Sequence, residues 1–149
     1  MKIGENAPDF TLKDGNGKDW TLSEQAGNTV VLLFYPGDNT PVCTKQLCSV
    51  RDNWSDYQET GAVVVGISTD SVESHSGFAD EYDLPLPLLA DVNGKVSKMY
   101  GATSWIPGKS ARAVVVIDEK GRISYHYVQP LGVFKPSDSE VLKAIAAAN

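Results

Sequence analysis

A continuous apolar strand leads, through a short Pro-Gly loop, into a helix that carries a cysteine in its first turn. Residues 29–35 are apolar and β-branched at their start, which is typical of a buried strand. Thr40 and Pro41 favour the N-cap and the first position of a helix. Cys43 then falls in the first turn, where free N–H groups and the helix dipole stabilise a thiolate. The pattern indicates an activated nucleophile, although a small buried cysteine near a helix start explains this position equally well.

The second cysteine of the chain, Cys48, lies five residues after Cys43. This C-x4-C spacing differs from the C-x2-C of thioredoxin-type oxidoreductases and zinc knuckles. On an intact helix the two residues are separated by about 7.5 Å of rise and roughly 140° of turn. A disulfide needs Cα atoms within about 7 Å and converging Cβ atoms. A bond between the two sulfurs therefore requires the helix to unwind, which suggests a redox cycle with a folded reduced state and a remodelled oxidised state.

Composition narrows the class of protein. A chain of 149 residues predicts one domain over residues 1–149. The net charge of −6 argues against nucleic acid and anionic membranes as partners. No apolar run approaches the roughly 20 residues that cross a bilayer, and the first residues contain no apolar signal region. We expect a cytoplasmic protein, in which a close cysteine pair is more often catalytic than structural.

The order of predicted elements indicates an α/β fold. Alternating residues around Asp14-Gly15-Asn16-Gly17 predict an N-terminal hairpin. The predicted strands are 10–13, 18–22, 29–35, 62–67, 87–90, 112–118 and 122–128, and the predicted helices start near Ser23, Thr40, Asp70 or Ser71, Lys95 and Ser137, the last with a Ser137–Glu140 capping box. Residues 104–110 and 130–136 are expected to be loops. Crossovers followed by a terminal hairpin imply a central mixed β-sheet with helices on both faces.

Side-chain spacing predicts which residues face inward. One apolar stripe at 3–4 spacing contains Cys43, Leu47, Val50, Trp54 and Tyr57. Cys43 should therefore face the interior, and Cys48 should point elsewhere. Trp54 is expected in the core and both histidines, His75 and His126, on the surface. Trp105 falls in a loop, and we expect it more often outside the active-site pocket than lining it.

The run FYPGDNTPVCTKQLCSVRD resembles the active-site signature of the peroxiredoxins, and more narrowly that of their Q-type, or bacterioferritin-comigratory-protein, branch. The pattern P-x3-T-x2-C matches at Pro36, Thr40 and Cys43. The resolving cysteine of the branch matches Cys48, and the family arginine matches Arg112 in ARAVVVID. GENAPDFTL, VVVGISTDS and LPLPLLAD extend the resemblance over nearly the whole chain. The sequence departs from the branch at Val42, Gln46 and Val50, where Gly, Glu and Phe are usual.

The resemblance implies a thioredoxin-like fold with an extra N-terminal β-hairpin and an atypical two-cysteine thiol peroxidase. Such an enzyme reduces hydrogen peroxide and organic hydroperoxides, and Cys43 becomes a sulfenic acid. Cys48 resolves the acid into an intramolecular Cys43–Cys48 disulfide, which thioredoxin or a similar dithiol protein reduces. No metal or organic cofactor is implied. The branch is often monomeric, which predicts a monomer.

The resemblance also assigns roles around the sulfur. The amides of Val42 and Cys43 are expected to donate to the peroxide oxygens, and the Thr40 hydroxyl to accept from the peroxide and donate toward sulfur. Arg112 is expected to contact both as a permanent charge, while Pro36 shields the thiolate from water. Without the family pattern, Thr40 is equally well a plain N-cap and Arg112 is better placed on the surface.

Two other functions fit parts of the pattern. A thioredoxin-type thiol–disulfide exchange protein would use two cysteines, but with two residues between them. A copper-binding chaperone of thioredoxin-like fold would use C-x3-C with a histidine, usually behind a membrane anchor. The C-x4-C spacing favours the peroxidase over both.

Overall fold

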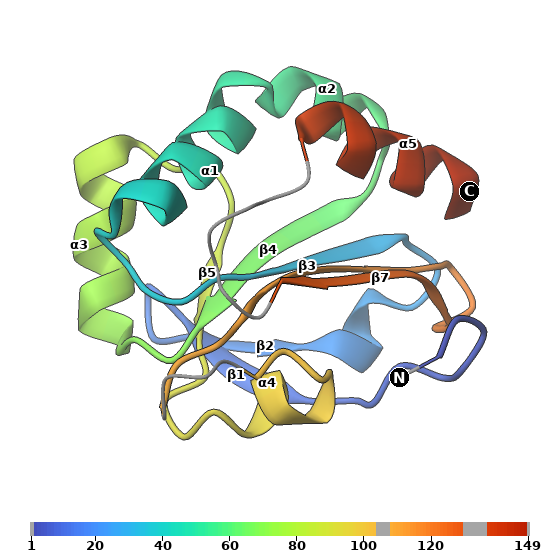
Figure 1. Cartoon of the computed structure of the whole chain (residues 1–149), viewed down its shortest axis with the longest axis horizontal. Helices are drawn as coiled ribbons and strands as arrows, with labels where there is room; N and C mark the ends of the chain where they lie inside the picture. Colours follow the sequence, from blue (N-terminus) through green and yellow to red (C-terminus); the bar gives the residue numbers. More distant parts are fainter. Residues whose placement is uncertain (1, 104–107, 130–136, 149) are drawn as a thin grey trace.

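A computed structural model describes residues 2–103, 108–129 and 137–148 (Figure 1). The strands are β1 Thr11–Asp14, β2 Asp19–Thr21, β3 Val30–Phe34, β4 Val63–Ser68, β5 Leu88–Ala90, β6 Arg112–Ile117 and β7 Ile123–Gln129. The helices are α1 Pro41–Asp52, α2 Trp54–Glu59, α3 Val72–Tyr82, α4 Lys95–Met99 and α5 Asp138–Ala148, with a short 3-10 helix, η1, at Leu22–Gln25. Trp105, most of the predicted loop 104–110 and the whole of 130–136 lie outside the described residues.

All seven described strands form one mixed sheet in the order β2-β1-β5-β4-β3-β6-β7. The central strands β3, β4 and β5 run parallel. Strand β6 pairs antiparallel with β3, and β7 pairs antiparallel with β6. The N-terminal hairpin of β1 and β2 joins the far side through an antiparallel pairing with β5. The predicted α/β fold with an N-terminal hairpin is confirmed.

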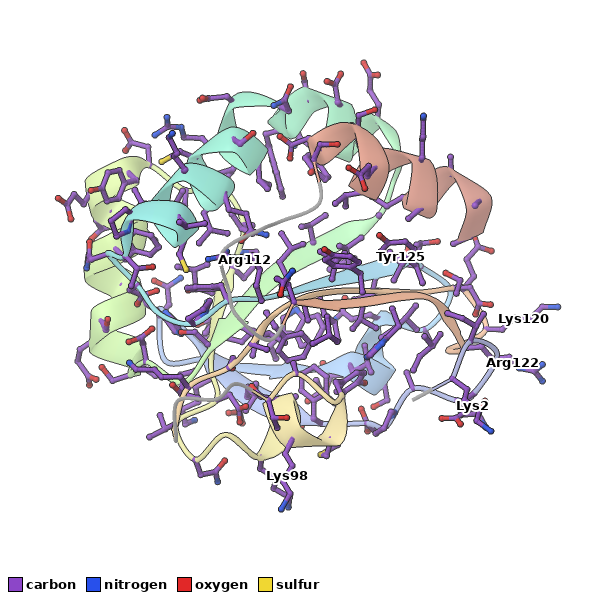
Figure 2. The ribbon with its side chains drawn as sticks, in the orientation of Figure 1. Lys2, Lys98, Arg112, Lys120, Arg122 and Tyr125 are labelled. Carbon is purple, nitrogen blue, oxygen red and sulfur yellow. The ribbon has the colours of Figure 1, made fainter. Side chains whose placement is uncertain are left out.

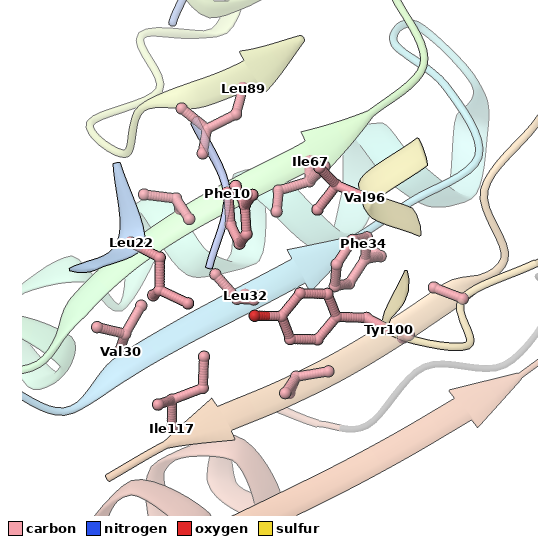
Figure 3. Packing of buried hydrophobic residues seen from close by; sticks show 14 of the residues in the cluster. Phe10, Leu22, Val30, Leu32, Phe34, Ile67, Leu89, Val96, Tyr100 and Ile117 are labelled. Atoms are coloured by element: carbon pink, nitrogen blue, oxygen red, sulfur yellow. The ribbon is translucent and has the colours of Figure 1, made fainter. Parts of the chain in front are cut away.

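The alternation of side chains along β3 divides the core into two layers. Val30, Leu32 and Phe34 belong to one cluster, which includes Tyr100 and residues of η1 and α4 (Figure 3). Val31, Leu33 and Tyr35 belong to the other cluster, with residues of α1, α2, α3 and α5. Helices therefore cover both faces, and the larger helices share the face that carries α1 (Figure 1).

Helix α1 starts where the sequence predicts, but the predicted single stripe is divided. The chain leaves the helical path at Asn53, which is the C-cap of α1 and precedes the first residue of α2. Tyr57 is buried as expected, whereas Trp54 is only partly buried against the same core cluster. The interruption at Asn53 separates α1, which carries both cysteines, from the short α2.

Helix boundaries agree with the predicted caps at two places and differ at a third. The Ser71 side chain accepts from the Ser74 N–H and caps α3. Ser137 and Glu140 form the predicted capping box before α5. Ser23 does not cap η1, because this helix already begins at Leu22.

Among the described residues, no helix is both long and apolar enough to cross a bilayer.

Candidate active site

Cys43 lies in the first turn of α1, just beyond the loop that follows the carboxyl end of β3. Its side chain is completely buried in the cluster between the sheet and the helices. Cys48 is partly exposed, and both cysteines are free thiols. The predicted inward and outward directions of the two cysteines are confirmed, and no disulfide joins them while α1 is a regular helix.

Arg112 lies on the sheet against which α1 packs, and it contacts Cys43 from there. It is the first residue of β6 and lies on the same face as Val114 and Val116, which pack toward α1. Its Nη2 donates to the Cys43 Sγ at 3.1 Å, and its Nη1 donates to the Gln46 Oε1. Only 1% of Arg112 is exposed, and Figure 2 shows it inside the molecule, unlike Arg122 at the periphery. The surface assignment from residue type alone is therefore wrong, and the structure places the guanidinium against the Cys43 sulfur.

The contact between guanidinium and sulfur has a chemical consequence. A buried cation costs several kcal/mol unless anionic or polar partners surround it. A hydrogen bond from a permanent cation is stronger toward a thiolate than toward a neutral thiol. The Arg112 guanidinium and the N-terminus of α1 thus both direct positive charge at the Cys43 sulfur.

In the sequence, Gln46 is marked only by its departure from the family pattern. It lies three residues after Cys43 and is buried on the same side of α1. By accepting from Nη1 of Arg112, the Gln46 amide leaves Nη2 directed at the sulfur. The 3-residue spacing from Cys43 is the signal that could have identified it.

Thr40 occupies the N-cap position of α1, but its side chain makes no capping hydrogen bond. Its hydroxyl instead donates to the Gly37 carbonyl oxygen at 3.1 Å. The interpretation of Thr40 as a plain side-chain cap is therefore wrong, and in this reduced form the hydroxyl does not donate to sulfur. The oxygen keeps its lone pairs, so it can still accept from an incoming hydroperoxide.

The start of α1 also presents backbone donors. The first bond of the helical ladder runs from the Thr44 N–H to the Thr40 carbonyl at 2.9 Å. The N–H groups of Val42 and Cys43 precede this ladder and have no intrahelical acceptor. Pro36, at the entrance to the loop, is half-buried. The predicted site residues from Pro36 to Cys43 thus lie together, with Arg112 across from them.

His75 is not on the surface, and the prediction for it is wrong. Its side chain is completely buried, with Nδ1 at 2.9 Å from the Asp38 Oδ2 and Nε2 at 3.0 Å from the Leu89 carbonyl oxygen. Phe78, three residues later on α3, is buried on the same side, and this spacing is the sequence signal that could have placed His75 inside. His126 is half-buried, with Nε2 at 2.8 Å from the Tyr100 carbonyl oxygen.

One cluster of ligand-type atoms lies near the loop. Oxygen or nitrogen atoms of Asp38, Asp70 and His75 lie within 4.8 Å of one another. However, these groups already bond to protein partners, and no buried side-chain N or O atom in the described part of the chain lacks a partner. The cluster is thus complete as a hydrogen-bond network.

The amino-acid sequence matches a known protein family and is similar to curated proteins of plants. Residues 3–126 match the model of the AhpC/TSA family. A chloroplastic peroxiredoxin Q from Triticum aestivum is 47% identical over 125 residues, which are 83% of this chain and 58% of the wheat protein. The corresponding protein from Arabidopsis thaliana is 44% identical over 146 residues, which are 97% of this chain and 67% of that protein.

A solved structure gives the same relationship in three dimensions. The crystal structure of the peroxidoxin BcpB from Mycobacterium tuberculosis superposes with a TM-score of 0.86 at 34% identity, covering 99% of this chain and 96% of that one. The chain spans 58%, 67% and 59% of the length of the first three curated relatives.

Proposed function

Because this chain belongs to the AhpC/TSA family, the peroxiredoxins, we propose that it is a thiol-dependent peroxidase acting on hydrogen peroxide and organic hydroperoxides. The observation that carries the proposal is the 3.1 Å contact from the Arg112 Nη2 to the Cys43 Sγ in the first turn of α1. A buried thiolate held by a permanent cation and a helix N-terminus suits attack on a neutral, polarisable O–O bond.

In the first step the Cys43 thiolate attacks the terminal oxygen of the hydroperoxide. The S–O bond forms as the O–O bond breaks, and the departing oxygen takes a proton and leaves as water or an alcohol. The Val42 and Cys43 amides and the Arg112 guanidinium stabilise the charge on the departing oxygen, and the Thr40 hydroxyl oxygen holds the substrate by accepting a hydrogen bond from its O–H group. Pro36 keeps water from the sulfur. The product is Cys43 sulfenic acid.

In the second step the Cys48 thiolate attacks the Cys43 sulfur. An S–S bond forms, the sulfenic oxygen leaves as water, and the disulfide holds the two oxidising equivalents of the peroxide. Since both cysteines lie on one regular helix, α1 must unwind around them for this step. A dithiol protein of the thioredoxin type then supplies two electrons and restores the two thiols.

Steady-state turnover with NADPH, thioredoxin reductase and thioredoxin tests this function, with hydrogen peroxide and cumene hydroperoxide compared. We expect NADPH oxidation that depends on peroxide and on the protein and that Cys43→Ser abolishes. A parallel reaction with dithiothreitol separates the two parts of the proposal. Peroxide loss with dithiothreitol but not with thioredoxin would contradict only the assignment of thioredoxin as the reductant. No peroxide loss with either reductant would contradict the peroxidase activity itself.

We also propose that the protein is a monomer, and light scattering of the reduced and the oxidised forms tests this oligomeric state. Cytoplasmic localisation stays a prediction for this chain, although the names of the wheat and Arabidopsis relatives include "chloroplastic".

A further inference from the structure

The Asp38 side chain lies in the middle of the loop between β3 and α1 and is only 1% exposed. Three groups lie within hydrogen-bond distance of its carboxylate: the Tyr35 hydroxyl at 2.7 Å, the Ser74 hydroxyl at 2.8 Å and the His75 Nδ1 at 2.9 Å. These groups come from the end of β3 and from α3. The loop is therefore attached by a buried charged side chain to a helix that carries none of the proposed reacting groups.

A proton must lie between Asp38 and His75, because their atoms are 2.9 Å apart. The Leu89 carbonyl can only accept, so the His75 Nε2 carries a proton as well. Burial would raise the pKa of Asp38, but the hydrogen bonds from His75, Tyr35 and Ser74 outweigh it and lower this pKa below its ordinary value. Asp38 and His75 thus form a buried hydrogen-bonded pair that joins the loop to α3.

The main chain of the loop is held at the same residue. The Asp38 N–H donates to the Asp70 Oδ2 at 2.8 Å, and the Ser68 hydroxyl donates to the same oxygen at 2.6 Å. The Lys109 Nζ and the Asp70 carboxylate both lie beside Gly37. The Asp38 carboxylate and the Asp38 amide are therefore both fixed, by α3 and by the end of β4 respectively.

The residues on either side of Asp38 lead directly to the reacting groups. Gly37 supplies the carbonyl that accepts from the Thr40 hydroxyl. Asn39 has a positive φ of 62°, a conformation that costs a non-glycine residue about 1 kcal/mol and that persists when neighbours fix it. The Thr40 side chain does not cap α1, so the anchors at Asp38 replace a cap in setting how the chain enters the helix.

We propose that Asp38 and His75 are positioning residues for the peroxide step: their buried pair sets the loop so that the Thr40 hydroxyl and the first amides of α1 lie around Cys43. The inference rests on the proposed peroxidase function. In this role neither Asp38 nor His75 contacts the substrate.

Two reactions of Cys43 distinguish positioning from general damage. Hydrogen peroxide needs both of its oxygens oriented, whereas iodoacetamide needs only an accessible thiolate. Asp38→Ala should lower the ratio of the peroxide rate constant to the alkylation rate constant by at least about tenfold, the size of one lost hydrogen bond in the transition state. Asp38→Asn keeps the shape, with one oxygen that accepts from Tyr35 and one N–H group that faces the His75 Nδ1, and should recover most of this ratio.

His75→Asn is the second variant, because its amide can donate to Asp38 in place of Nδ1 while losing the Leu89 contact. We expect a ratio between those of Asp38→Ala and wild type. His126→Asn is the matched control, since it removes a histidine that contacts a backbone carbonyl away from the loop, and its ratio should equal that of wild type. Thermal melts identify any variant that fails to fold.

A wild-type ratio in folded Asp38→Ala and His75→Asn would overturn the positioning role and leave the peroxidase proposal intact. Equal loss in Asp38→Ala and Asp38→Asn would also overturn it, because the hydrogen-bond geometry would then not explain the effect. A wild-type protein that reacts with peroxide no faster than free cysteine would instead remove the proposed function itself.

Discussion

Arg112 and Cys43 are 69 residues apart in the chain, yet the Arg112 Nη2 donates to the Cys43 Sγ at 3.1 Å. Sheet register explains the contact. Strand β6 runs antiparallel to β3, with Ala113 opposite Phe34, so the start of β6 lies beside the end of β3. Helix α1 begins a short loop beyond this end, and the alternation along β6 turns Arg112 toward the helix.

Replacement of Arg112 by Met should slow the reaction of Cys43 with hydrogen peroxide by about 10²–10³-fold, by analogy with removal of one oxyanion-hole donor. Stopped-flow tryptophan fluorescence of the reduced protein measures this rate constant. Arg122→Met is the matched control, because Arg122 is exposed on the turn before β7 and should react like wild type. An unchanged rate in folded Arg112→Met would place the guanidinium outside the reaction.

Replacement of Cys48 by Ser should preserve the first oxidation and stop the cycle at sulfenic acid. Cys43 and its buried partners are unchanged in this variant, whereas the attacking sulfur of the second step is absent. Mass spectrometry after one equivalent of peroxide and dimedone should show one adduct on Cys43, and thioredoxin-coupled turnover should collapse. Full turnover without an adduct would exclude Cys48 from the mechanism.

Oxidation should unwind the part of α1 that contains both cysteines. This step breaks several backbone hydrogen bonds, each worth about 1 kcal/mol net, and withdraws Leu47 from a core in which it is fully buried. Amide hydrogen exchange from Thr44 to Arg51 should therefore be faster in the disulfide form than in the dithiol form. Helix α3 serves as the internal reference.

The unwinding should not extend through α2. The carboxylate of Asp138, in the first turn of α5, accepts from the Tyr57 hydroxyl at 2.5 Å, from the Asn53 amide at 3.2 Å and from the Ser49 hydroxyl. Exchange at Tyr57 should thus remain slow. Equally slow exchange from Thr44 to Arg51 in both states, with the Cys43–Cys48 bond confirmed by mass, would contradict the unwinding.

The sequence predicts the fold well because its signals are local. The buried strand β3, the Thr40-Pro41 helix start and the Ser137–Glu140 capping box depend on neighbouring residues, and the structure contains all three. The inward direction of Cys43 follows from helical spacing in the same way. These features need no knowledge of the rest of the chain.

The remaining features depend on contacts between distant segments. Burial of Arg112 requires the register of β6 against β3, and burial of His75 requires a carboxylate 37 residues away. The Thr40 hydroxyl donates to the Gly37 carbonyl and does not accept from the helix amides, and only the path of the loop determines this arrangement. Residue type alone therefore predicts the wrong environment for Arg112 and His75.

Alkaline pH should destabilise the protein. Burial, with a nearby carboxylate in each case, raises the pKa of Tyr35, Tyr57 and Tyr100. In the unfolded chain these tyrosines ionise near pH 10, so unfolding releases protons there and the free energy of unfolding falls as the pH rises through about 10.

Urea unfolding between pH 8 and 11 measures this change, and absorbance at 295 nm reports tyrosine ionisation. Tyr57→Phe should lessen the pH dependence, although loss of the Asp138 hydrogen bond lowers its stability at neutral pH. Stability that stays constant to pH 11, or full ionisation of all tyrosines in the folded protein near pH 10, would contradict the prediction.

Rapid mixing of the reduced protein with hydrogen peroxide at pH 7 measures whether Cys43 is a nucleophile activated for reaction with peroxide. We expect one peroxide consumed per protein, with a rate constant at least about 1,000 times that of free cysteine, equivalent to about 4 kcal/mol of transition-state stabilisation. Cys43→Ser should abolish this reaction. A rate constant equal to that of free cysteine, or an undiminished reaction in Cys43→Ser, would show that Cys43 is not the peroxide-reducing nucleophile.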